Sequence, residues 1–211
     1  MTEALAFDAL VQALHPQVAA LPDDRTGKHT QDTITDAALG ALAVFLTPSP
    51  AWLASQRTMP PANGRRNTES RFGMAAVPCD QPIRRLLDPV VPAQVWPGFE
   101  EVYAALEGAG HVSALRSCAG PLLIAWAGTE DVSAPELHGA HCSQRPHAKG
   151  RVPYGPQAST PVLVAPGHPE VIPLAPACIT PHAGHATQEC DQVAAKRWMA
   201  RQAGRSPQVT I

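Results

Sequence analysis

A short segment of the sequence concentrates residue types that bind borderline metal ions. His138, His141, Cys142 and His147 fall within a stretch of ten residues, as His-x-x-His-Cys followed by a further histidine. Imidazole nitrogen and thiolate sulfur are the ligands of structural zinc sites, commonly four to a site. The spacing therefore predicts a candidate Zn²⁺ site at these four residues. The alternative interpretation is a solvated polar excursion of the chain that binds no metal.

Arginines form a second candidate functional group. The segment 57–85 contains six arginines against two acids, whereas residues 1–36 hold six acids against two basic residues. Cations of this kind contact DNA phosphates without reading base sequence. Five of them are candidate DNA-binding residues: Arg57, Arg65, Arg66, Arg84 and Arg85. The alternative is a solvated charged face of the fold.

The sequence lacks several motifs that identify other enzyme classes. It contains no G-x-S-x-G nucleophile elbow, no Walker A loop and no G-x-G-x-x-G dinucleotide fingerprint. Hydrolases with a nucleophile elbow, P-loop nucleotidases and dinucleotide-dependent oxidoreductases are therefore not indicated.

Charge and cysteine content restrict the compartment and the partners. The formal net charge is −2, so no global field attracts nucleic acid. The five cysteines are odd in number and scattered, unlike the disulfide framework of a small secreted domain, and Cys118 and Cys190 are expected to be small buried hydrophobes. The chain has no basic leader, and no stretch approaches the roughly 20 apolar residues that span a bilayer. We therefore expect a cytoplasmic protein without a membrane partner.

The elements that position these residues begin with helices. Phe7, Leu10, Val11 and Leu14 recur at the spacing of one helical face, and Pro16 is expected to disrupt that helix. Further helices are expected over 33–46, over 80–87 with Asp80 as N-cap, and over 99–108.

Strands are expected after residue 121. The apolar run PLLIAWA (121–127) predicts a buried strand. PVLVA (161–165) and EVIPL (170–174) predict two strands joined by a hairpin turn at PGHP.

The last expected element is a helix at about 190–203, with Val193, Ala194 and Trp198 facing inward. The order of elements predicts the α/β class, with an N-terminal helical region (1–115) followed by a mixed α/β domain (116–211).

Nine segments spread over residues 21 to about 200 share patterns with a known family. They are RTGK (25–28), DAALGALAVF (36–45), QRTM (56–59), R-N-x-x-S-x-F-G (66–73), PCDQPIRRLLDP (78–89), LLIAWAGT (122–129), HCSQRPHAKG (141–150), TPVLVAPGHPEVIPL (160–174) and AAKRW (194–198). In this order and spacing they resemble the DDE-type transposases of bacterial insertion sequences, particularly the ISNCY group and its relatives. The resemblance implies an RNase H-like catalytic domain, DNA as the substrate and DNA transposition as the ancestral activity.

The resemblance also implies a metal centre, and here the sequence departs from the family. Three acidic residues in the family hold Mg²⁺ for strand cleavage and transfer, and the first ends the first strand in an Asp-Gly-Thr motif. This chain has Ala127-Gly128-Thr129 instead, and Ala127 has no oxygen with which to bind a metal. Glu130 and Asp131 follow, but we expect them to point into the loop after the strand. No catalytic residue is therefore predicted.

The remaining features of the family are also incomplete. The second and third acids are expected on a later strand and helix, and the sequence ends at Ile211 before them. At the zinc cluster, the related transposases have His-Cys-x-x-Cys, and Gly139 stands in place of the first cysteine. The expected fold is thus an incomplete RNase H-like domain after a helical region, in a truncated and inactive transposase copy that binds DNA weakly. Two alternatives stay open. One is a non-catalytic DNA-binding or regulatory fragment, whose protein partner would be an intact transposase or a second copy of this chain. The other is a small zinc-binding module.

Overall fold

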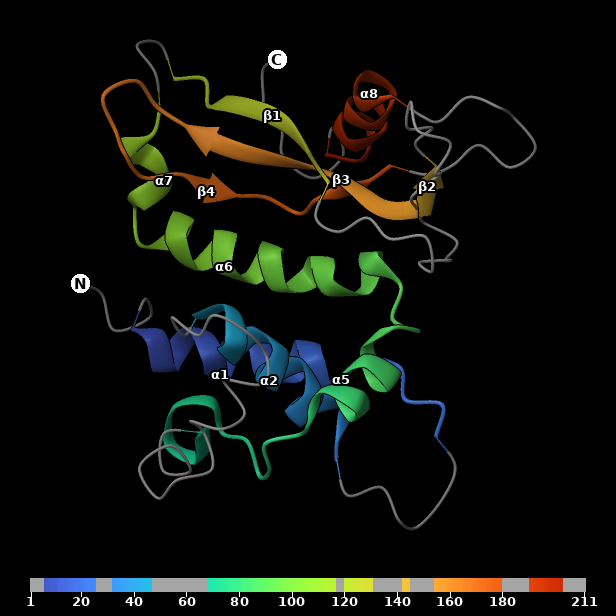
Figure 1. Ribbon diagram of the computed structural model, residues 1–211. Coiled ribbons are helices and arrows are strands. Elements are labelled where there is room, and N and C mark those ends of the chain that lie inside the picture. Colours follow the sequence, from blue (N-terminus) through green and yellow to red (C-terminus); the bar gives the residue numbers. More distant parts are fainter. Residues whose placement is uncertain are drawn as a thin grey trace. The chain divides into compact units, whose positions relative to one another are not determined.

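The computed structural model describes residues 6–25, 32–46, 68–116, 120–130, 142–144, 154–179 and 190–202 (Figure 1). The chain divides into two compact units, Met1–Ala109 and Gly110–Ile211. The boundary lies ahead of the expected one after residue 115. Helices make up the regular structure described in the first unit, and the second combines helices with an antiparallel sheet. A mixed α/β fold is therefore confirmed.

The first unit follows the predicted helices closely. Its elements include α1 (Phe7–Ala19), α2 (Ile34–Leu46), α5 (Asp80–Leu87), a 3₁₀ helix η2 (Pro92–Val95) and α6 (Trp96–Gly108). Asp80 is not the N-cap of α5, because Cys79 occupies that position and Asp80 is the first helical residue.

Helix α1 continues through Pro16, contrary to the expectation that this proline would disrupt it. A proline inside a helix loses one backbone hydrogen bond. Burial of side chains stabilises the helix after Pro16. Val18 packs against the two hydrophobic clusters described below, and Leu21 is 6% exposed. This burial offsets the lost hydrogen bond.

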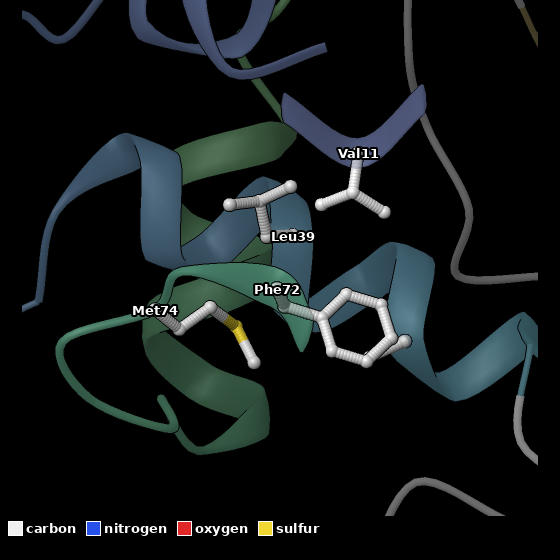
Figure 2. Close-up of a cluster of buried hydrophobic side chains, with 5 residues drawn as sticks. Val11, Leu39, Phe72 and Met74 are labelled. Carbon is white, nitrogen blue, oxygen red and sulfur yellow. The ribbon is translucent and has the colours of Figure 1, made fainter. Parts of the chain in front are cut away.

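Among the described residues of the first unit, two hydrophobic clusters form the core, and α2 contributes to both. Figure 2 shows side chains of the first, in which Val11 of α1 and Leu39 of α2 converge with Phe72 and Met74. In the second, Ile34 and Ala37 of α2 meet Leu21, Ile83 and Leu86, the last two from α5. Helix α2 is apolar over most of its surface because it packs against α1 and against α5.

A buried carboxylate fixes the segment that follows residue 68. Thr33 caps α2 by accepting a hydrogen bond from the backbone N–H of Asp36 at 2.9 Å. Asp36 is 4% exposed, and its Oδ1 accepts a hydrogen bond from the N–H of Ala75 at 2.9 Å. A buried carboxylate without donors would be strongly destabilising, so this contact ties Ala75 to α2.

The second unit is built around strand β3 (Tyr154–Val164). Strand β1 (Leu123–Glu130) pairs antiparallel with it, from Leu123 opposite Val164 to Glu130 opposite Gln157. Three short strands also pair antiparallel with β3: β2 (Cys142–Gln144), β4 (Ile172–Pro173) and β5 (Ala177–Cys178). The predicted hairpin at PGHP is confirmed, with Gly167 at φ 80° in its turn. Strand β5 was not predicted.

Helix α8 (Asp191–Gln202) lies against β1, β3 and β5, and the short helix α7 (His111–Ala114) opens the unit (Figure 1). Ala194 and Trp198 are buried as predicted, whereas Val193 is 45% exposed and does not face inward. The Trp198 ring meets that of Trp126 edge-on at 5.6 Å between centroids, and its Nε1 donates to the carbonyl oxygen of Ala175 at 2.8 Å.

Candidate functional site

Position 127, where the resemblance places the first metal-binding acid, lies inside strand β1. Ala127 is exposed and pairs with Thr160 of β3. The strand continues to Glu130, which pairs with Gln157, so the expectation that it would end at Ala127 and release Glu130 into the loop is wrong. The physical reason is that β3 extends far enough toward its N-terminus to pair with residues 128–130. Asp131 lies outside the described residues.

The two faces of β1 have different environments. Ile124 and Trp126 pack against the cluster that contains Ala194 and Trp198 of α8. Successive side chains of a strand point to opposite faces. Gly128 therefore faces α8, and Ala127 projects from the other face of the sheet.

A carboxylate lies directly over Gly128, at the first residue of α8. A Cβ atom on Gly128 would be 2.7 Å from Asp191 Oδ1 and 3.1 Å from Oδ2. The same Oδ1 accepts a hydrogen bond at 2.7 Å from the hydroxyl of Ser159, which is fully buried in β3. The carboxylate thus connects α8 to the sheet through two positions distant in sequence.

Asp191 does not replace the acid that is absent at position 127. It lies on the face of Gly128, whereas a side chain at position 127 points away from α8. Sequence reasoning did not single out Asp191, although a glycine within a strand signals close approach by another group. The contact still joins residues 63 positions apart, and nothing in the sequence specified the partner.

The residues described do not contain a metal centre. Within them, no three histidine, cysteine, aspartate or glutamate side chains lie close enough to bind one ion together. Of the predicted zinc ligands, Cys142 begins β2, while His138, His141 and His147 lie outside the described ranges.

Two of the five candidate DNA-binding arginines can be placed. Arg84 and Arg85 are exposed on α5, whose opposite face buries Ile83 and Leu86. Arg57, Arg65 and Arg66 lie outside the part of the chain that the structure describes.

Acids surround the two arginines of α5. Asp80 begins the helix and Asp88 follows its last residue. The side-chain hydrogen bond from Arg25 is the largest cause of the lowered pKa of Asp23, and the positive charge of Arg85 also lowers this pKa. Arg85 therefore lies near Asp23. Arg25 Nη2 lies 2.7 Å from Asp23 Oδ2. The surface around α5 is therefore close to electrically balanced.

The acidic N-terminal region also neutralises part of the arginine-rich segment. Arg71 Nη1 lies 3.2 Å from Asp8 Oδ1, with both side chains more than half exposed. Exposed ion pairs of this kind stabilise a fold only weakly. Their effect on function is larger, because a paired arginine offers less net charge to a phosphate.

Cys79, Cys178 and Cys190 are free thiols. Cys190 is exposed just before α8, so the expectation that it would be buried is wrong: the core of α8 begins one turn later, at Ala194. Cys178 is partly buried, and burial raises the pKa of its thiol, against the opposing charges of Arg197 and Arg201.

No protein-family model, curated protein or solved structure matches the chain. In the part that the structure describes, none of the helices combines the length and apolar character needed to cross a bilayer.

Proposed function

We propose that this chain derives from a DDE-type transposase, that its second unit is the first part of an RNase H-like domain, and that its remaining activity is weak, sequence-independent DNA binding. The order of strands carries the proposal. Along the chain β1, β3 and then β4 with β5 form successive antiparallel neighbours, and α8 follows on one face of that sheet. The resemblance to the transposases implies an RNase H-like domain, and an antiparallel sheet followed by a helix on one face is compatible with its α/β class. Strand β2 is an additional short element between the first two.

The surroundings of position 127 support the loss of catalysis. The family's metal pair requires hard oxygen ligands that converge on one point. Ala127 supplies none, and the Asp191 carboxylate that lies over Gly128 is on the other face and already bound by Ser159. The described residues therefore do not fit the Mg²⁺ centre of the family, and we assign no catalytic step to them.

The charge distribution supports DNA binding through the segment before residue 68 more than through α5. Arg84 and Arg85 lie among acids, and Arg71 is paired with Asp8. Arg57, Arg65 and Arg66 have no acid between positions 57 and 68 of the sequence. These three arginines are the principal candidates for phosphate contacts.

The test is binding of the full chain to an unrelated DNA duplex, followed by fluorescence anisotropy over a series of salt concentrations. We expect binding at low salt that weakens steeply as salt rises. Replacing Arg65 and Arg66 together with Ala should reduce the slope of log K against log salt by about 1.8, or 0.9 for each lost phosphate contact.

The matched control replaces Arg84 and Arg85 with Ala, which removes the same charge from the balanced surface of α5. Its effect on the slope should be clearly smaller. Absence of binding by the unmodified chain at low salt would overturn the proposed DNA-binding function, and equal effects of the two double variants would reject the assignment to Arg65 and Arg66.

A further inference from the structure

Strand β1 is an edge strand without the usual protection against pairing. Among the described strands it pairs with β3 alone, which leaves its other edge open. Proteins commonly protect such an edge with a short strand, a lysine, a proline or a bulge, because unpaired backbone groups pair readily with another chain. The eight residues LIAWAGTE contain no lysine and no proline, and their pairing with β3 runs without a bulge. The outer edge of β1 is therefore a surface on which a further strand can pair.

The hydrogen bonds of β3 determine which residues of β1 direct their backbone groups outward. Leu163 pairs with residues of both β1 and β4, so these two strands lie on opposite edges of β3. The N–H of Leu174, just after β4, donates to the carbonyl oxygen of Pro161 at 2.9 Å. Backbone groups alternate between the two edges of a strand, so the odd-numbered residues of β3 face β4 and the even-numbered ones face β1. These even-numbered residues pair with the odd-numbered residues of β1, so the even-numbered residues of β1 face outward.

Four residues of β1 therefore present backbone N–H and C=O groups at its outer edge: Ile124, Trp126, Gly128 and Glu130. Leu122 has the same orientation just before the strand, and there Arg116 forms an antiparallel bridge with it. This bridge agrees with the assigned direction and occupies the edge at Leu122. An added strand must therefore pair after that residue, where the exposed Ala125, Ala127 and Gly128 lie.

The outward groups of β1 are complementary to those of a second copy of β1. The midpoint of the open segment is Ala127. In an antiparallel pair centred there, Ile124 of one copy lies opposite Glu130 of the other, and Trp126 lies opposite Gly128. Every outward residue then has a partner, with about eight backbone hydrogen bonds at two for each hydrogen-bonded pair.

Charge and side-chain size also favour a second copy as the partner. Like charges directly opposite each other destabilise a strand pair. Glu130 is the only charged residue of β1, and this register places it opposite Ile124 rather than opposite a second Glu130. Trp126, the largest residue of the strand, lies opposite Gly128, which has no side chain. The self-paired strands thus have neither charge repulsion nor two bulky residues in opposition.

We propose that two copies of this chain associate through the outer edges of their β1 strands, and that the two sheets form one continuous antiparallel sheet about a two-fold axis at Ala127. The surface is distinct from the arginines proposed to contact DNA, and the inference does not depend on that function. The alternatives are that a strand of a different protein pairs with this edge, or that nothing does.

A disulfide cross-link tests the register. Residues of odd number bond to β3, so Ala127 would form a non-hydrogen-bonded pair with itself, with Cα atoms about 4.5 Å apart. This distance is within the range of about 4.4–6.8 Å for a disulfide. The Ala127→Cys variant should therefore form a covalent dimer on mild oxidation, and peptide mass spectrometry should find the peptide around position 127 linked to itself.

Ala125→Cys is the matched control for this cross-link. Ala125 is exposed on the same face of β1 as Ala127. In the proposed register it lies opposite Thr129, so the two copies of position 125 are four residues apart along the strand, or about 14 Å. This variant should not form a linkage between the two copies of position 125.

Charge substitutions test the same contact without a covalent link. Ala127→Lys and Ala127→Glu each place like charges opposite each other at the two-fold axis. By sedimentation velocity, each variant should be monomeric at concentrations at which the unmodified chain is a dimer, and an equimolar mixture of the two should dimerise again. Circular dichroism checks that each variant is folded, and the cysteine pair gives an independent result if one is not.

Three results would reject the proposal. One is an unmodified chain that stays monomeric at every concentration, which would leave the edge to a strand of another protein or to no partner. Another is a dimer that persists in both charge variants, because it would use a different surface. The third is equal cross-linking of the Ala125→Cys and Ala127→Cys variants.

Discussion

Replacing Gly128 with Ala tests the contact between β1 and α8 directly. The new Cβ would lie 2.7 Å from Asp191 Oδ1 and 3.2 Å from its Cγ, well inside ordinary contact distance. Asp191 is exposed, so its side chain can rotate away, but only by giving up the hydrogen bond from Ser159. The fully buried hydroxyl would then have no acceptor.

The expected cost follows from that lost bond. Leaving a buried hydroxyl without its partner costs about 1–3 kcal/mol. Restricting the unfolded chain by Gly→Ala returns about 0.4–1 kcal/mol. The second unit should therefore lose about 1–2 kcal/mol of unfolding free energy, or about 5–15 °C in melting temperature for a domain of about 100 residues.

The assay is thermal and urea unfolding followed by circular dichroism. Gly108→Ala is the matched control, because a Cβ at that position of α6 meets no atom within 4 Å. It should be neutral or stabilising by up to about 1 kcal/mol.

A double-mutant cycle isolates the pair. In an Asp191→Ala background the obstruction is gone and Ser159 has already lost its acceptor, so Gly128→Ala should cost almost nothing further. If Gly128→Ala costs as much in that background as in the unmodified chain, the proposed steric reason is wrong.

Two further predictions concern chemistry. Purified protein should show no nicking or strand transfer above background with Mg²⁺ or Mn²⁺, and Ala127→Asp alone should not restore either, because a single carboxylate on that face cannot hold two metal ions; cleavage that is lost on changing Glu130 or Asp131 would contradict this. Because burial raises the pKa of the Cys178 thiol, less of it is thiolate near pH 8, so it should be alkylated more slowly than the exposed Cys79 and Cys190; peptide mass spectrometry after iodoacetamide treatment measures this, and equal rates would show that Cys178 is accessible.

Local pattern was sufficient wherever one apolar face determined an element. Helices were predicted over 33–46, 80–87, 99–108 and about 190–203 from periodicity and turn residues alone, together with the hairpin at PGHP. The structure has them as α2, α5, α6 and α8, with α6 beginning three residues earlier, at Trp96. Helices α2, α5 and α8 each bury side chains whose spacing can be read from the local sequence.

The structure differs from the sequence-based predictions where residues distant in sequence stabilise an element. Helix α1 continues past Pro16 because Val18 and Leu21 are buried by other elements. Strand β1 extends past Ala127 because β3 continues alongside it. The helix or strand propensity of the local sequence does not include either of these long-range contacts.

The features of the candidate site can likewise be divided into those that the sequence determined and those that the tertiary structure determined. The sequence by itself determined that position 127 has no metal-binding oxygen, since residue type alone decides this. The tertiary structure decided which face of the sheet position 127 occupies and that Asp191 lies on the other one, against Gly128 and Ser159. It also decided that Arg85 lies near Asp23. Electrostatic interactions depend on distance in space, and folding sets that distance for residues far apart in the chain.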